Sequence, residues 1–272
     1  MLAHVGIFDS GLGGLTVARA LRERAPGLPM LYVGDTARFP YGEQVAADLE
    51  NRVVAVGRSL VDRGCTTLVV ACNTASSVAL ERLRHELPVP VVGMEPPLKP
   101  AAASTKSGRV VVLATAGTAA GERLARLEAD HASDVTVHTV PMPGLADLVE
   151  AGRARDPQVL EMLKAATREP VALGADAIAL GCTHYGFVEK SLRSFLPEHV
   201  AIIDAAEAVA RRTLAVLEEV GLQVPAGERR PVDYDVTGDR RAFVAAVDCL
   251  RDAGEAIPDL TDIRRRAVAV GA

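Results

Sequence analysis

The chain has 272 residues, a formal net charge of -5 and 49% apolar residues, enough to form one large or two medium domains with a proper core. The acidic balance, the 3% aromatic content and the absence of tryptophan argue against a nucleic-acid surface. No apolar segment approaches the ~20 residues that span a bilayer, so we expect a cytoplasmic protein with no membrane contact.

Apolar runs alternate with amphipathic helical segments along the chain, which is the pattern of a parallel α/β sheet. We expect strands at 4–8, 30–33, 67–71, 89–93, 109–114, 135–140, 177–180 and 200–203. Helices are expected between them, for example at 15–24, 46–62, 76–86 and 207–220. Arg264, Arg265 and Arg266 form the only basic run, which we interpret as a solvated tail or helix face.

Two stretches are typical of crossings between domains. Residues 95–100 contain three prolines and lead into small residues, and the strand pattern restarts at Arg109. A second crossing is expected near 203–206. These positions predict a discontinuous first domain, 1–96 with 207–272, and a second domain, 97–206.

A repeated segment draws attention to two of the four cysteines. Gly64 precedes Cys72 by eight positions, and Gly174 precedes Cys182 by the same number, with an apolar strand between them in both copies. A free cysteine usually packs in the core, but ligands of α/β sheets bind beyond the carboxyl ends of strands. The repetition favours a site at Cys72 and Cys182, whereas Cys65 and Cys249 are expected to be packing residues.

Two cysteines on opposite walls of a cleft could form a disulfide, bind a soft metal or act as paired bases. Redox pairs usually lie close in sequence, and the chain has no C-x-x-C motif that would indicate a metal site. Of the three possibilities, a pair of bases best suits a reaction that inverts the configuration of a carbon centre. Inverting a carbon centre without a cofactor needs a base on one face and an acid on the other.

The neighbours of the two cysteines include groups that can tune a thiol. His184 follows Cys182 by two residues, and Asp9 and Asp35 end strands in the first half. Neutral donors suited to a carboxylate ligand are Ser10, Asn73, Thr74 and Thr183.

Cofactor motifs are incomplete. The glycine-rich turn at 11–14 resembles a dinucleotide site, but Thr16 stands where the third glycine is needed. None of the four lysines ends a predicted strand, where a pyridoxal phosphate Schiff base would be expected. We therefore expect no cofactor and no metal.

Four blocks of the chain, residues 8–15, 33–42, 71–76 and 180–185, closely resemble the signature blocks of glutamate racemases. Their order and spacing agree from about residue 5 to about residue 245. The resemblance implies two flavodoxin-like α/β domains related by pseudo-twofold symmetry, with the active site in the cleft between them. It also implies cofactor-independent interconversion of L- and D-glutamate for peptidoglycan synthesis, and a homodimer.

The resemblance also implies roles for individual residues. Cys72 and Cys182 correspond to the two catalytic bases, the first acting on the D-enantiomer and the second on the L-enantiomer. Asp9 and His184 correspond to residues that assist them, and Glu150 to a further assisting acid. The implied substrate contacts are Asp9, Ser10, Tyr41, Gly42, Asn73, Thr74, Thr115, Thr118, Thr183 and His184.

Several alternatives stay open. A related enzyme could act on aspartate, a hydantoin or maleate, and a non-catalytic role as a gyrase inhibitor is known among such proteins. Glu150 could simply be a glutamate on a helix surface. Residues 114–121 and 141–143 depart from the usual family blocks, which affects the expected carboxylate contacts of the second domain but not the two cysteines.

Overall fold

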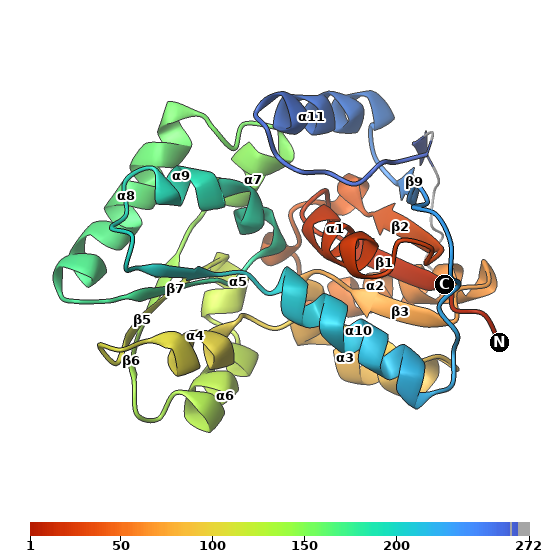
Figure 1. The fold of residues 1–272 in the computed structure, drawn as a ribbon, viewed down its shortest axis with the longest axis horizontal. Coiled ribbons are helices and arrows are strands. Elements are labelled where there is room, and N and C mark those ends of the chain that lie inside the picture. The colour runs from red at the N-terminus through yellow and green to blue at the C-terminus, as the bar shows by residue number, and fades with distance from the viewer. Residues whose placement is uncertain (262, 266–272) are drawn as a thin grey trace.

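The computed structural model describes residues 1–261 and 263–265, whose strands form two parallel sheets (Figure 1). The first sheet contains β1 (Val5–Asp9), β2 (Met30–Gly34), β3 (Thr67–Val70), β4 (Val91–Gly93), β9 (Asp233–Val236) and β10 (Arg264–Arg265). The second contains β5 (Arg109–Ala114), β6 (Thr136–Pro141), β7 (Ala177–Leu180) and β8 (Ala201–Ile203). The expectation of a parallel α/β architecture is confirmed.

The two sheets share a strand order. The first runs β10-β9-β2-β1-β3-β4 and the second β6-β5-β7-β8, so the first four strands of each follow the order 2-1-3-4. This is the flavodoxin-like order, in which ligands bind at the carboxyl ends of the central strands. Cys72 follows the third strand of the first sheet, and Cys182 follows the third strand of the second. The sequence repeat therefore marks equivalent positions in two similar sheets.

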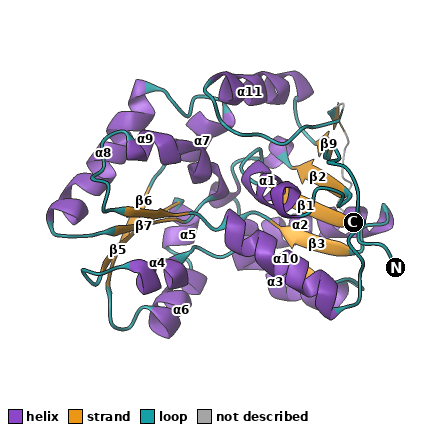
Figure 2. Ribbon diagram, viewed as in Figure 1, coloured by secondary structure: helices purple, strands orange, loops and turns teal. Residues whose placement is uncertain are grey.

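Helices cover both sheets (Figure 2). The α-helices are α1 (Leu15–Arg24), α2 (Ala46–Asp62), α3 (Asn73–Glu86), α4 (Leu98–Ser104), α5 (Ala116–Ala119), α6 (Glu122–His131), α7 (Leu145–Glu150), α8 (Pro157–Ala172), α9 (Glu189–Arg193), α10 (Ala206–Glu219) and α11 (Arg240–Asp252). Short 3₁₀ helices are η1 (Thr36–Arg38), η2 (Tyr41–Glu43) and η3 (Thr183–Val188). In the first sheet, α1 packs with α10 and α2 packs with α3.

Burial on both faces explains why the strands read as continuous apolar runs. All residues of β1 and β7 are buried. In β1, Ile7 belongs to the core that also contains α1 and α10, whereas Phe8 belongs to the core under α2 and α3. The first of these cores continues into the second sheet through Ile178 and Leu180. One apolar interior therefore joins the two sheets.

Several predictions need correction. The strand expected from residue 89 begins at Val91, because Pro90 has no N–H to donate to the ladder. The helix expected from residue 76 begins at Asn73, directly after Cys72. Cys249 is exposed on α11, so it is not a packing residue, whereas Cys65 is buried as expected.

Arg264 and Arg265 form a short strand beside β9 rather than a tail or helix face, and Arg266 lies outside the described residues. Among the described residues, no helix is both long and apolar enough to cross a membrane. The chain passes from the first sheet to the second between β4 and β5, and returns after β8 into α10. The exact domain boundaries at 96–97 and 206–207 stay a prediction.

The two repeat glycines end their helices in the same way. Gly64 and Gly174 have φ values of 84° and 94°. The amides of Gly64 and Cys65 donate to Val61 and Leu60, which is a Schellman motif. The same pair of hydrogen bonds recurs at Gly174.

We therefore expect Gly64→Ala to lower the free energy of unfolding by about 1–2 kcal/mol, because a Cβ strains the left-handed backbone. No atom lies within 4 Å of the added Cβ, so conformation alone sets the cost. Urea denaturation measures it. Gly64→Asn is the matched control and should cost less, because asparagine tolerates this conformation better. Equal stability of the alanine variant and the wild type would contradict the prediction.

Candidate active site

The carboxyl ends of strands from both sheets meet at one cavity. Its lining residues are Ser10, Phe39, Pro40, Tyr41, Gly42, Cys72, Asn73, Thr74, Thr115, Thr118, Ala146, Gly181, Cys182, Thr183 and His184. The structure thus brings together every predicted substrate contact except Asp9. The cavity has a volume of about 30 Å³, which is room for only about two waters. A ligand as large as an amino acid requires the walls to move apart.

Cys72 lies at the start of α3 and is buried. Its thiol donates to Ser10 Oγ over 3.7 Å. Burial and the negative charge of Asp9 raise the pKa of the Cys72 thiol to about 12, although the Ala75 amide and the Ser10 hydroxyl oppose this rise. Cys72 is therefore a neutral thiol at physiological pH.

Cys182 has a different environment. Its Sγ lies 3.7 Å from Nδ1 of His184, and Nε2 of His184 lies 2.8 Å from Oε2 of Glu150. Burial would lower the pKa of His184, but the contacts with Cys182 and Glu150 raise it well above its usual range. The raised pKa favours the imidazolium form of His184, which faces the Cys182 sulfur on one side and Glu150 on the other.

Glu150 lies inside the protein rather than on a helix surface. It ends α7, and its side chain is 16% exposed. The same Oε2 that contacts His184 also accepts a hydrogen bond from the Leu12 amide over 2.8 Å. Glu150 therefore links the second sheet's helix to the loop after β1 while it orients the histidine.

Asp9 lies behind the cavity wall rather than in it. The residue is fully buried; its Oδ1 accepts from the Gly11 amide over 2.8 Å and its Oδ2 from the Thr183 hydroxyl over 3.0 Å. Burial raises the pKa of Asp9, and the charge of His184 and the Gly11 hydrogen bond oppose this rise. Asp9 acts on the site through its charge and through Thr183.

The remaining predicted contacts offer hydrogen bonds to a ligand. Both polar side-chain atoms of Asn73 are buried and lack a hydrogen-bond partner among the described residues. Buried amides without partners are rare in native proteins, and Asn73 faces the cavity. The first amides of α3 are also free of intrahelical acceptors, which suits an anion. Thr115 and Thr118 add hydroxyls that hydrogen-bond each other over 3.0 Å.

The sequence did not single out four lining residues, Phe39, Pro40, Ala146 and Gly181. The Phe39 ring lies 5.3 Å from the His184 ring, between centroids. Phe39 and Pro40 lie in the block 33–42, and Gly181 lies in the block 180–185. Their place in these blocks could have indicated that they line the site. Ala146 is a small apolar residue on a helix, and nothing in its sequence context distinguishes it from a core residue.

These features define a constellation in which two thiols share one cavity. The model of the Asp/Glu/Hydantoin racemase family matches residues 15–213. The chain belongs to this family of racemases. Glutamate racemase of Ralstonia pickettii is 43% identical over 90% of this chain and 88% of its own length. Glutamate racemase of Pseudomonas aeruginosa is 47% identical over 79% and 82%, respectively.

Solved structures agree with this assignment. Escherichia coli glutamate racemase, in complex with L-glutamate and the activator UDP-MurNAc-Ala, matches with a TM-score of 0.85 and 32% identity over 99% of this chain and 100% of that one. Glutamate racemase of Thermus thermophilus, in complex with β-chloro-D-alanine, matches with a TM-score of 0.79 and 35% identity over 98% and 97%. Picrophilus torridus aspartate racemase, at 16% identity, shares the fold alone.

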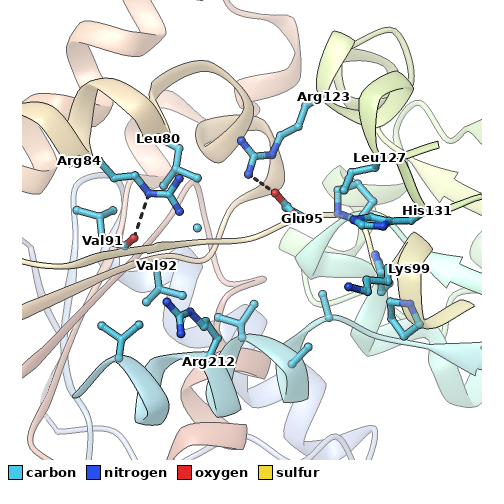
Figure 3. A pocket seen from close by; sticks show the side chains of 18 residues that line it. Leu80, Arg84, Val91, Val92, Glu95, Lys99, Arg123, Leu127, His131 and Arg212 are labelled. Carbon is cyan, nitrogen blue, oxygen red and sulfur yellow. Dashed lines mark hydrogen bonds and ion pairs between the residues drawn. The ribbon is translucent and has the colours of Figure 1, made fainter. Parts of the chain in front are cut away.

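A second cavity lies where the chain crosses between the sheets (Figure 3). It has a volume of about 340 Å³ and touches both crossings, at Glu95–Pro97 and at Ala205. Its charged lining residues are Arg84, Glu95, Lys99, Arg123 and Arg212. Four of these five are cations, of which Arg123 pairs with Glu95, Arg84 with Glu81 and Arg212 with Glu219.

The charge of Asp9 generates a prediction for Cys72. Asp9→Asn removes a negative charge beside the thiol, so the pKa of Cys72 should fall and more thiolate should form. At pH 9, iodoacetamide should alkylate Cys72 severalfold faster in Asp9→Asn than in the wild type. Mass spectrometry of the Cys72 peptide measures the rate.

Cys65 supplies the internal control for this measurement. Burial raises its pKa to about 12 as well, but it is not in the cavity. Its alkylation rate should be the same in both proteins. An unchanged Cys72 rate, or equal acceleration of both cysteines, would contradict the assigned effect of Asp9.

Proposed function

We propose that the protein is a cofactor-independent glutamate racemase that uses Cys72 and Cys182 as its two bases. One observation carries this proposal: the two thiols end equivalent strands of two sheets, line one cavity and have neighbours of opposite charge. A base and an acid on opposite faces of one carbon are what inversion of a stereocentre requires.

In the L-to-D direction, Cys182 is the base. The His184 imidazolium stabilises its thiolate, which takes the α-proton of L-glutamate and becomes a thiol. The electron pair of the broken C–H bond stays on the substrate as a carbanion. Cys72, which begins as a thiol, then donates its proton to the opposite face. In the reverse direction the two cysteines exchange roles.

The charge of Asp9 explains why Cys72 starts as the acid. A carboxylate beside a thiol favours the protonated sulfur. The substrate ammonium, bound near Cys72, has the opposite effect and lowers the pKa of this thiol. Cys72 therefore becomes an effective base only when the substrate is present. A low fraction of Cys72 thiolate also limits its oxidation.

The carboxylates of glutamate match the donors around the cavity. Asn73 and the first amides of α3 are suited to one carboxylate. Ser10, Thr115 and Thr118 supply hydroxyls for the other, whereas the Thr183 hydroxyl is already donated to Asp9. Glutamate rather than aspartate is proposed because the relatives of Ralstonia pickettii and Pseudomonas aeruginosa are named for glutamate. We further propose that the protein supplies D-glutamate for peptidoglycan synthesis in the cytoplasm, and the homodimer stays a prediction.

The decisive experiment is incubation of purified protein with L-glutamate in heavy water. Optical rotation should fall to zero, and deuterium should appear at Cα in the product. Cys72→Ala and Cys182→Ala should each reduce racemisation by about 10²–10⁴-fold, because each removes one proton-transfer group. Polarimetry and mass spectrometry measure the two outcomes.

Cys65→Ala and Cys249→Ala are matched controls that remove a thiol outside the cavity, and both should remain active. Retention of the α-proton and of full optical activity by the wild type would overturn the racemase proposal. Activity that survives Cys72→Ala or Cys182→Ala would remove that thiol from the mechanism. Faster turnover of L-aspartate than of L-glutamate would overturn the substrate assignment only.

We also propose that the cavity between the crossings binds an anionic activator of the kind bound by the Escherichia coli relative. Its four cationic side chains could bind a diphosphate by exchanging their present carboxylate partners for phosphate oxygens. Its contact with both crossings would couple the ligand to the relative position of the sheets.

UDP-MurNAc-Ala should therefore raise the initial rate of racemisation. The double variant Arg84→Gln, Arg212→Gln should need at least about tenfold more activator for half of the effect, because each lost charge-assisted hydrogen bond weakens binding. Arg58→Gln is the control, because Arg58 is an exposed arginine that does not line this cavity. Equal activation of all three proteins would contradict this assignment, and so would no activation of the wild type.

A further inference from the structure

Asp35 is a buried carboxylate at the end of β2 that does not line the active-site cavity. Its Oδ2 accepts hydrogen bonds from Nε of Arg52 over 2.8 Å and from the Tyr41 hydroxyl over 2.6 Å. Its Oδ1 accepts from Nη2 of Arg52 over 2.5 Å and from the Thr237 hydroxyl over 2.6 Å. Side chains from η2, from α2 and from the residue after β9 therefore converge on one carboxylate.

Thr237 ties the C-terminal part of the chain to the turn after β2. Its hydroxyl accepts from the Ala37 amide over 3.1 Å while it donates to Asp35. Its own amide donates to the Gly34 carbonyl over 3.1 Å, and the amide of Gly238 donates to the Thr36 hydroxyl over 3.0 Å. Residues 237–238 thus hold both sides of the turn at 34–37.

The segment that follows this turn forms one wall of the active-site cavity. Phe39, Tyr41 and Gly42 all line it, and Phe39 lies against His184. Gly42 also meets the second sheet's loop: a Cβ added to Gly117 would lie 3.2 Å from the Gly42 carbonyl oxygen. The position of residues 39–42 therefore determines both the shape of the cavity and its closure against the second sheet.

Asp35 is suited to be a fixed anchor rather than a proton carrier. Burial would raise its pKa, but hydrogen bonds from Arg52, Thr237 and Tyr41 lower it below the usual value. The carboxylate therefore stays ionised throughout the pH range in which a racemase works. The Tyr41 hydroxyl is committed to Asp35, so Tyr41 offers the cavity its ring and backbone.

We propose that Asp35, Arg52 and Thr237 are positioning residues of the racemase, which hold the 39–42 segment against the substrate through Tyr41. The proposal rests on the racemase function and adds that the C-terminal strand segment controls one wall of the site from outside it. Loss of the network should loosen this wall. Substrate binding should then suffer more than proton transfer, because neither cysteine is touched.

The test is steady-state kinetics of Thr237→Val, which replaces the hydroxyl by a methyl group of similar size. We expect KM for glutamate to rise about tenfold with kcat changed less than about threefold. Thr237→Ser, which restores the hydroxyl, should return KM to within about threefold of the wild type. Thr167→Val is the matched control, because Thr167 is a buried threonine whose hydroxyl donates to the Leu163 carbonyl on α8. Its kinetic constants should equal those of the wild type.

A double-mutant cycle with Tyr41→Phe tests whether both residues act through Asp35. The double variant Tyr41→Phe, Thr237→Val should be about as impaired as the worse single variant, because either change already releases the segment. Independent residues would instead multiply their effects. If Thr237→Val does not fold, Arg52→Lys replaces it in the test. Lysine keeps the positive charge but cannot make the bidentate contact with Asp35, so KM should again rise.

The outcomes separate this proposal from the proposed function. A wild-type protein that does not racemise glutamate overturns the function. A wild type that racemises glutamate, with Thr237→Val and Thr167→Val indistinguishable, overturns the positioning network alone. Multiplicative effects in the cycle, or failure of serine to rescue Thr237→Val, also overturn it.

Discussion

The hydrogen bond from the Thr183 hydroxyl to the Asp9 carboxylate is the interaction on which the site depends. It joins the loop after β7 to the end of β1, and therefore one sheet to the other. Asp9 is fully buried, so this bond cannot be replaced by water without opening the cavity. The contact of Glu150 with Leu12 and His184 adds a second polar link between the two sheets. These links hold the two thiols, which come from different sheets, at one cavity.

The site combines an approximate repeat of backbone with a difference in charge. The strand order places Cys72 and Cys182 equivalently, yet the first has a carboxylate nearby and the second an imidazolium. The carboxylate and burial favour the protonated form of Cys72, because a nearby negative charge and loss of solvent both disfavour a thiolate. The repeat brings two thiols to one cavity, and their charged neighbours differ.

Part of this arrangement was readable from the pattern of residues. Apart from Asp9 at the end of β1, the runs that form β1 and β7 carry no polar side chain because both faces of each sheet are covered, and such runs are recognised without any knowledge of contacts. The repeat of Gly64 and Cys72 at Gly174 and Cys182 identified the two strand ends. The start of α3 was misplaced by three residues, since Asn73 and Thr74 are weak helix formers whose place in the first turn depends on the strand before them.

By itself, the sequence determined the α/β class, the two cysteines and the identity of most lining residues, because these depend on periodicity, spacing and recognisable blocks. Tertiary structure decided the rest. In the structure, Asp9 lies behind the wall of the active-site cavity, and Glu150 contacts His184 rather than lying on a helix surface. Thr237 donates a hydrogen bond to Asp35, which is 202 positions away in the sequence. The physical reason is that the pKa of a buried group and the aim of a side chain depend on neighbours contributed by distant segments, which local residue patterns do not encode.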